Sequence, residues 1–283
     1  MRIGFHTAGA GSLEGSANKA RELGANCFQL FSSSPRMWRG SALKPADVAK
    51  MLEVRREFDL EPVAIHANYL INLASIDPEI RGKSVAAFRG ELERGAQMEA
   101  HYLVLHPGSF KGQTLETGIL AFVEALVEAT GDFAGGKPML LLENTVGAGS
   151  QIGQRFEELK AIRDLAVGRV GLEIGYCLDT CHMLAAGYDI ATAEGLEATA
   201  TEIEGTIGFD LVKVIHANDS KGVLGSHLDR HENIGAGQIT EAGFRRILTH
   251  PKFRGKPFLL ETPFEDDAGI VKDVEALKRL CIE

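Results

Sequence analysis

The stretch from residue 213 to residue 238 contains several residue types that bind metal ions in proteins. It reads K-V-I-H-A-N-D-S-K-G-V-L-G-S-H-L-D-R-H-E-N-I-G-A-G-Q, and it begins with an apolar run that is typical of a short buried strand. His216 and Asp219 follow that run, and Asp229 and His231 come later in a glycine-rich loop. In an extended chain, the spacing of Asp229 and His231 points both side chains the same way. Carboxylates and imidazoles that converge in this manner suit a divalent cation such as zinc.

A histidine or a carboxylate also follows most of the other apolar runs. Each case alone is weak, because a single histidine after a strand is more often a hydrogen-bonded core residue. Glu143 and Glu261 each end a run of leucines, and a buried carboxylate is costly unless a cation, a proton or a metal ion neutralises it. Taken together, nine such residues favour one shared metal site: His66, His106, Glu143, Asp179, His182, His216, Asp229, His231 and Glu261.

The number of candidate ligands indicates more than one ion. Five histidines and four carboxylates exceed the needs of a single catalytic zinc ion with an open position. They suffice for three ions if one carboxylate bridges two of them. Neighbouring metal ions clamp the attacking and leaving oxygens of a displacement at phosphorus, and they lower the pKa of bound water. The set therefore predicts phosphodiester hydrolysis.

Strand-like and helical segments alternate along the whole chain. Strands are expected at 2–5, 27–31, 62–65, 102–105, 139–142, 174–178, 212–215 and 257–260. Helical spacing marks 45–58, 80–99, 115–130, 155–165, 191–207 and 241–250. No linker interrupts this order, which predicts an α/β fold, a single (β/α)₈ TIM barrel over residues 1–283 with the metal site at the C-terminal face of its strands. A doubly wound sheet is the alternative, disfavoured because no glycine-rich phosphate fingerprint follows the first strand.

Composition limits the class of protein. The chain has 45% hydrophobic and 24% charged residues, as globular proteins do. No apolar run approaches the ~20 residues that span a membrane, and the N-terminus lacks a secretory signal, so a cytoplasmic protein is expected. The four cysteines form no C-x-x-C pair and are expected to be reduced and mostly buried.

Charge alone argues against nucleic-acid binding, since the formal net charge is −9. Metal ions change this conclusion. Three divalent ions would bring the net charge to about −3 and would concentrate positive potential where the ligands converge.

Seven segments resemble the signatures of the endonuclease IV family of apurinic/apyrimidinic (AP) endonucleases. They are H-A-N-Y-L-I-N-L at 66–73, L-H-P-G-S at 105–109, L-E-N-T at 142–145, L-D-T-C-H at 178–182, I-H-A-N-D-S at 215–220, D-R-H-E-N-I-G-A-G at 229–237 and L-E-T-P at 260–263. The match runs in order over essentially the whole chain. The pairing of D-T-C-H with D-R-H-x-x-x-G-x-G is highly specific.

The resemblance implies three zinc ions per chain, with Mn²⁺ as an alternative ion at one site. The implied ligands are His66, His106 and Glu143 for the first ion, Asp179, His216 and Glu261 with Glu143 as a bridge for the second, and His182, Asp229 and His231 for the third. Glu143 and Glu261, which would hold the first two ions, are the expected catalytic carboxylates.

The resemblance also implies the activity and the partner. The family cuts the phosphodiester 5′ to an abasic deoxyribose, leaves a 3′-hydroxyl, and trims blocked 3′ ends. Arg36 and Tyr69 are implied to enter the base stack of abasic double-stranded DNA, while Trp38 and Leu70 are expected to pack under their loops. Ser34 stands where the family usually has asparagine. A monomer without an obligate protein partner is expected.

Two other classes of function are weighed. A sugar isomerase or epimerase is the main alternative, since related barrels use positions like Glu143, Asp179, His216 and Glu261 around one metal ion. Such an enzyme does not need the other five candidate ligands. A non-catalytic metal-binding or DNA-binding barrel is disfavoured, because structural zinc sites use few ligands and no helix-turn-helix pattern is present.

Overall fold

Eight parallel strands close into a barrel in the computed structural model, which describes residues 1–7, 11–133 and 137–282. The order around the barrel follows the chain, and the last strand, β10, pairs with the first, β1. The barrel strands are β1 Ile3–His6, β2 Cys27–Phe31, β3 Val63–His66, β4 Tyr102–Leu105, β5 Met139–Glu143, β6 Ile174–Asp179, β7 Val212–His216 and β10 Phe258–Leu260. The predicted (β/α)₈ barrel is confirmed.

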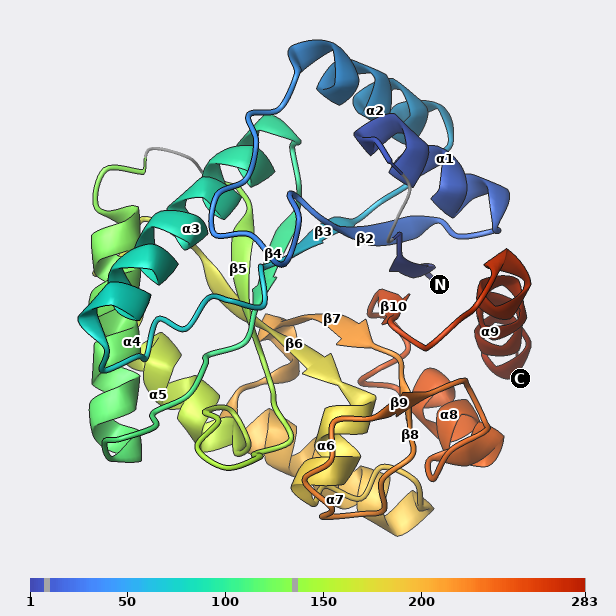
Figure 1. The fold of residues 1–283 in the computed structure, drawn as a ribbon. Helices are drawn as coiled ribbons and strands as arrows, with labels where there is room; N and C mark the ends of the chain where they lie inside the picture. The colour runs from blue at the N-terminus through green and yellow to red at the C-terminus, as the bar shows by residue number, and fades with distance from the viewer. Residues whose placement is uncertain (8–10, 134–136, 283) are drawn as a thin grey trace.

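Helices surround the strands (Figure 1). They are α1 Leu13–Glu22, α2 Pro45–Glu57, α3 Pro78–Gln97, α4 Leu115–Thr130, α5 Phe156–Ala166, α6 Thr180–Ala186, α7 Ala193–Thr206, α8 Thr240–Thr249 and α9 Asp267–Leu280, with a short 3₁₀ helix, η1, at Phe209–Leu211. The six predicted helices agree with α2, α3, α4, α5, α7 and α8 to within two residues. Helices α1, α6 and α9 lie outside the predicted ranges.

Local sequence signals set several helix starts. The Asp77 carboxylate accepts from the amide groups of Glu79 and Ile80 at the start of α3, and Pro78 occupies the first helical position. A proline is suited to this position because its missing N–H would have no partner there. This pair explains why α3 begins two residues before the predicted helix.

The described residues form two apolar cores. The larger lies between the strands and the helices. The smaller takes one buried residue from each of seven strands and fills the barrel interior: Cys27, Ala64, Val104, Leu141, Cys177, Val214 and Leu259. The remaining strand contributes Gly4, where a Cβ atom would lie only 1.9 Å from the carbonyl oxygen of Cys27. Close approach of β1 and β2 therefore requires a glycine at this position.

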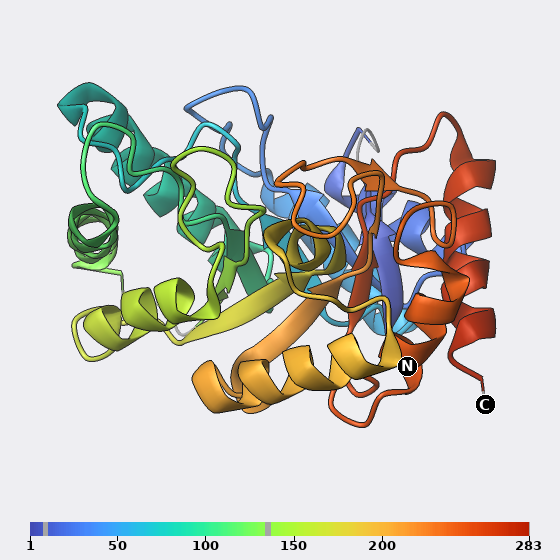
Figure 2. The same cartoon turned by 90° about the horizontal axis from the view of Figure 1, so that it is seen from below.

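A small hairpin stands apart from the barrel. Its strands, β8 Asp219–Ser220 and β9 His231–Glu232, pair antiparallel between β7 and α8. In Figure 2 the orange segment that contains this hairpin lies at one end of the barrel, together with the connections that follow several other strands. This end is the carboxyl end of the strands, where a barrel places its active site.

The cysteines and the helices bear on two further sequence predictions. Cys27, Cys177 and Cys181 are buried and Cys281 is partly exposed, which agrees with the expectation that the cysteines are mostly buried. None of the helices in the described residues is long and apolar enough to span a membrane.

Candidate metal centre

The period of a β-strand places the candidate ligands in one layer. Side chains alternate along a strand, so a residue two positions beyond an interior residue also points into the barrel. Each of the eight interior positions is followed at that spacing by a polar residue: His6, Gln29, His66, His106, Glu143, Asp179, His216 and Glu261. The apolar interior therefore forms a floor, and a ring of histidines, carboxylates and one glutamine stands directly above it.

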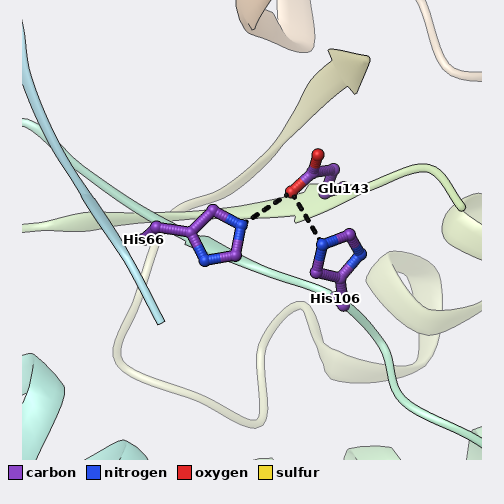
Figure 3. A group of neighbouring side chains, drawn as sticks. All are labelled: His66, His106 and Glu143. Carbon is purple, nitrogen blue, oxygen red and sulfur yellow. Dashed lines mark hydrogen bonds and ion pairs between the residues drawn. The ribbon is translucent and has the colours of Figure 1, made fainter. Parts of the chain in front are cut away.

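The first group of candidate ligands comprises His66, His106 and Glu143 (Figure 3). Glu143 Oε2 lies 3.2 Å from His66 Nε2 and 3.4 Å from His106 Nε2. The three side chains come from the ends of β3, β4 and β5, which are neighbours in the barrel. Strand order therefore brings together residues that are up to 77 positions apart in the chain.

The second group comprises Glu143, Asp179, His216 and Glu261. His216 Nδ1 lies 2.9 Å from Glu143 Oε1, 3.4 Å from Glu261 Oε2 and 3.9 Å from Asp179 Oδ2. Glu143 thus presents one carboxylate oxygen to each group. Its position between the two groups is the position that a bridging ligand requires.

The third group comprises His182, Asp229 and His231. Asp229 Oδ1 lies 3.4 Å from Nε2 of each histidine. His182 is buried in α6, whereas the Asp229 side chain is 51% exposed. Figure 1 shows that α6 and the hairpin segment lie side by side, and the two elements are also in contact.

Three of the histidines are oriented by a backbone oxygen that lies within hydrogen-bond distance of Nδ1. The Nδ1 atoms of His66, His182 and His231 lie 2.8, 2.9 and 3.2 Å from the backbone oxygens of Ala67, Asn144 and Glu261. Each ring can donate its N–H to that oxygen, and this fixes the tautomer that leaves Nε2 free to bind a metal ion. His231 Nε2 is buried and has no hydrogen-bond partner among the described residues. An imidazole nitrogen that makes no hydrogen bond within the described residues, with carboxylate oxygens of Asp229 and Asp179 at 3.4 and 3.8 Å, fits a metal site.

Electrostatic coupling within the centre is strong. Burial alone would raise the pKa of the Glu143 carboxyl, but the surrounding histidines, led by His106 and His216, lower it well below its usual value. Burial alone would lower the pKa of His182, whereas Asp179 and Asp229 raise it to about 10. The pKa values of His66 and His216 are raised as well, so without metal ions protons on these three histidines neutralise the buried carboxylates.

Gln29 was not among the predicted site residues. Its amide oxygen accepts from His216 Nε2 at 2.9 Å, and its Nε2 donates to Glu261 Oε1 at 2.5 Å. Gln29 also approaches His6 Nδ1 at 3.1 Å, which gives His6 its place beside the centre. A lone glutamine inside the apolar strand Cys27–Phe31 was the sequence signal for this role.

Two asparagines within two residues of strand ends were also not among the predicted site residues. Asn218 donates to Asp179 Oδ2 at 2.6 Å and accepts from the Glu261 amide at 2.8 Å. Asn144 accepts from the Asp179 amide at 2.7 Å. The sequence shows that an asparagine follows Glu143 and His216 within two residues. Which side chains these asparagines contact depends on which strands are neighbours in the barrel.

The predicted DNA-contacting residues are both exposed. Tyr69 is 66% exposed, and its ring stands edge-on to Phe31 at 5.2 Å between centroids. Arg36 is exposed in the loop after β2. Trp38 packs against the core, as predicted, and Leu70 is half-buried.

A pocket of about 340 Å³ opens between Tyr69 and the candidate ligands. His66, His106 and Asp229 line it, together with polar side chains such as Gln151. The candidate ligands are therefore accessible to a molecule that enters beside Tyr69.

Two residues near the ligands have structural roles instead. His227 Nδ1 lies 2.7 Å from the backbone oxygen of Val146, and this hydrogen bond explains the position of the ring without a metal ion. Burial raises the pKa of the Cys181 thiol to about 12. A buried neutral thiol is consistent with the prediction that Cys181 packs as a small apolar residue.

Comparisons with known proteins agree with this architecture. Residues 17–280 match the model of the xylose isomerase-like TIM barrel family. A protein of Solibacter usitatus named probable endonuclease 4 is 52% identical over 281 residues, covering 99% of this chain and 97% of the relative. Another probable endonuclease 4, from Halothermothrix orenii, is 41% identical and covers 99% of both chains.

A solved structure is also similar over nearly its full length. Endonuclease IV from Thermus thermophilus has a TM-score of 0.84 and 37% sequence identity, with 99% of this chain and 98% of that chain covered. High identity to named relatives and the same fold lead to one conclusion: the chain belongs to the endonuclease IV family.

Proposed function

We propose that this chain is a zinc-dependent AP endonuclease that hydrolyses the phosphodiester on the 5′ side of an abasic site in double-stranded DNA and leaves a 3′-hydroxyl. The observation that carries the proposal is the convergence of nine histidines and carboxylates in three neighbouring groups at the barrel mouth, two of which share Glu143. Relatives named endonuclease 4 support the assignment to DNA endonucleases, which are hydrolases.

The donor set fits three divalent ions of the zinc type. Each group offers imidazole nitrogens and carboxylate oxygens within 4.8 Å of one another, which are donors that zinc accepts. His66, His106 and Glu143 would hold the first ion, and His182, Asp229 and His231 the third. The second would be held by Asp179, His216 and Glu261, with Glu143 shared between the first and second ions. Mn²⁺ is an alternative at one of the three sites.

Bound ions would supply Lewis-acid chemistry, stabilising negative charge on phosphate oxygens and lowering the pKa of water. The ligand residues of the chain would position the bound ions. Glu143 and Glu261 would be the catalytic carboxylates, because each faces His216 and Glu143 also faces the first group. Gln29 holds His216 and Glu261 in place through its amide.

DNA would approach past the loops after β2 and β3. The phosphates of a straight duplex cannot reach a recessed centre, so the duplex must bend and expose the lesion. Unstacking is cheapest where a base is already missing. The exposed side chains of Arg36 and Tyr69 stand at the rim and are proposed to enter the stack.

The proposal extends to damaged 3′ ends. Removal of a group that blocks a 3′ end breaks a bond between phosphorus and a 3′-oxygen, which is the same bond that is broken at an abasic site. The same residues would therefore trim blocked 3′ ends without a second active site.

A direct test is the incision of a defined substrate. Metal-replete protein is incubated with a duplex that contains one abasic site, and both ends of the cut are identified by mass spectrometry. The proposal expects a 3′-hydroxyl on one fragment and a 5′-deoxyribose phosphate on the other. Cleavage on the 3′ side, or no cleavage with three ions bound, would refute it.

The second arm of the test addresses sugar chemistry. A D-tagatose 3-epimerase-like protein shares the fold at a TM-score of 0.72 and 21% identity. The second group alone, with Glu143, Asp179, His216 and Glu261, could hold one metal ion as a sugar epimerase would require. Epimerisation of ketohexoses by fully active protein with one ion per chain would favour that class.

A further inference from the structure

Asp219 is a buried carboxylate for which the proposed function has no use. It is the first residue of β8, three positions after the end of β7, and it is fully buried. Its carboxylate accepts from the backbone amides of Gly235, Gly237 and Ile239 at 3.0, 3.0 and 2.8 Å, and from that of Thr240 at 3.3 Å. All of these donors lie in the segment that follows Asp229 and His231. The Asp219 side chain therefore fixes the backbone of residues 235–240 through four hydrogen bonds.

Glycines make this close approach feasible. A Cβ atom on Gly237 would lie 2.4 Å from the Ser220 carbonyl oxygen and 2.6 Å from Asp219 Oδ1. Gly235 has φ of 82°, in the left-handed region that side chains disfavour. The G-A-G sequence at 235–237 thus fits against Asp219 because neither glycine has a side chain.

A second buried carboxylate holds the residues that directly precede this segment. Asp273 of α9 is 1% exposed. It accepts from the Ile234 amide at 3.1 Å and from Asn233 Nδ2 at 2.9 Å. Asn233 also donates to the carbonyl oxygen of Pro263 at 2.9 Å. The two residues after β9 are therefore tied to the outer helix.

These contacts bracket the third group of candidate ligands. His231 pairs with Ser220 in the β8–β9 ladder, and the Lys221 amide donates to the Arg230 oxygen at 2.9 Å. Asp229 lies just before this ladder, and half of its side chain faces solvent. Its direction toward His182 therefore depends on the backbone that the ladder and the two carboxylates hold.

We propose that Asp219 and Asp273 are positioning residues that hold residues 229–240 in the conformation in which Asp229 and His231 face His182, and that they thereby set the affinity of this group for its metal ion. The inference rests on the proposed function for the metal ion itself. The positioning of residues 229–240 by the two carboxylates does not depend on the proposed function, because it can be measured in metal-free protein.

The first measurement uses metal-free protein. Amide hydrogen exchange of residues 229–240 is followed by mass spectrometry in wild-type protein, Asp219→Asn and Asp273→Asn. An asparagine presents one oxygen and one NH₂ group to donors that faced two oxygens, so exchange in this segment should accelerate in both variants. Asp189→Asn is the matched control, since Asp189 accepts the amides of Ala191 and Thr192 in another loop.

Gly237→Ala gives the same test with both carboxylates intact. The added methyl group must move the segment away from Ser220 and Asp219, so faster exchange is expected here as well. This variant keeps the inference testable if Asp219→Asn does not fold.

The second measurement is zinc affinity by competition with a chelator. The three variants should bind the third zinc ion about ten-fold or more weakly, within the 10–100-fold range typical of residues that orient ligands. The other two ions and the Asp189→Asn control should match wild type. Unchanged exchange in all variants, or faster exchange with unchanged zinc affinity, would overturn the inference. If wild-type protein binds fewer than three ions, the proposed metal assignment fails, and the exchange data still decide whether the carboxylates hold the segment.

Discussion

Glu143 Oε1 lies 2.9 Å from Nδ1 of His216, although the two residues are 73 positions apart and their strands are separated by β6. Both side chains are fully buried. The other carboxylate oxygen faces His66 and His106. Two groups of candidate ligands therefore depend on one side chain, while the third group does not include it.

This arrangement predicts different metal losses for two variants. Glu143→Ala should weaken two of the three sites, because it removes the ligand that the first and second groups share. Asp229→Ala should weaken the third site alone and still reduce incision strongly. Elemental analysis after gel filtration measures the ions retained, with Glu158→Ala as the control for a partly buried carboxylate that accepts the Gly153 amide outside the centre. Equal metal loss in the Glu143 and Asp229 variants would contradict a shared role for Glu143.

A second prediction concerns the pH dependence of zinc binding. Burial lowers the pKa of His182, but Asp179 and Asp229 outweigh it and raise this pKa to about 10 in the metal-free protein. The ring is therefore protonated at neutral pH, whereas a metal ion binds only the neutral imidazole. Zinc binding at the third group should release this proton, so the affinity should rise with pH and level off near pH 10. Chelator-buffered zinc titrations over this range, with Asp229→Ala to identify the third site, provide the measurement.

The same pKa affects the stability of the metal-free protein. The pKa of His182 in the folded state lies above its ordinary value of 6.5. Its contribution to the free energy of unfolding is therefore fully present below about pH 6.5, and it is lost as the pH rises through about 10. Urea unfolding in the presence of a chelator should show this decline in wild-type protein. A curve for His182→Asn with the same alkaline slope would show that other groups cause it.

The barrel was predictable because its signals are local. Apolar runs and their polar ends recur in every β/α unit, and five of these polar residues proved to be the last residues of their strands: His6, His66, Glu143, Asp179 and His216. Helix α1 gave a weaker signal, since it buries only Ser16, Ala17 and Ala20. Helix α6 is buried on nearly all sides and short, so it has no amphipathic pattern.

The residues that support the centre could not be assigned from sequence. Asp219 accepts from amides 16 to 21 positions away. The sequence alone does not show which donors lie next to its carboxylate. Gln29 reaches Glu261, which is 232 positions away and becomes its neighbour only when β10 closes the barrel against β1. The nine candidate ligands were found because their types are distinctive. Their assignment to individual ions remains a prediction.

The last prediction concerns the recognition of abasic DNA by an acidic chain. Replacing both Arg36 and Tyr69 with alanine should weaken binding to an abasic duplex by roughly 1–3 kcal/mol, as lost stacking on bases typically does. Both side chains are exposed and lie outside the three groups of candidate ligands, so the metal content should not change. Arg56→Ala with Phe58→Ala, a similar pair at the far end of α2, is the matched control.

Titrations of abasic and intact duplexes must be made at one salt concentration, because phosphate contacts make all DNA affinities depend on salt. Insertion into the stack favours the duplex that already lacks a base, since that duplex costs less to unstack. The double variant should therefore lose affinity for the abasic duplex and retain its affinity for intact DNA. A double variant that keeps the wild-type preference for abasic over intact DNA would place recognition of the lesion elsewhere in the mouth, with the pocket beside His66, His106 and Gln151 as the next region to test.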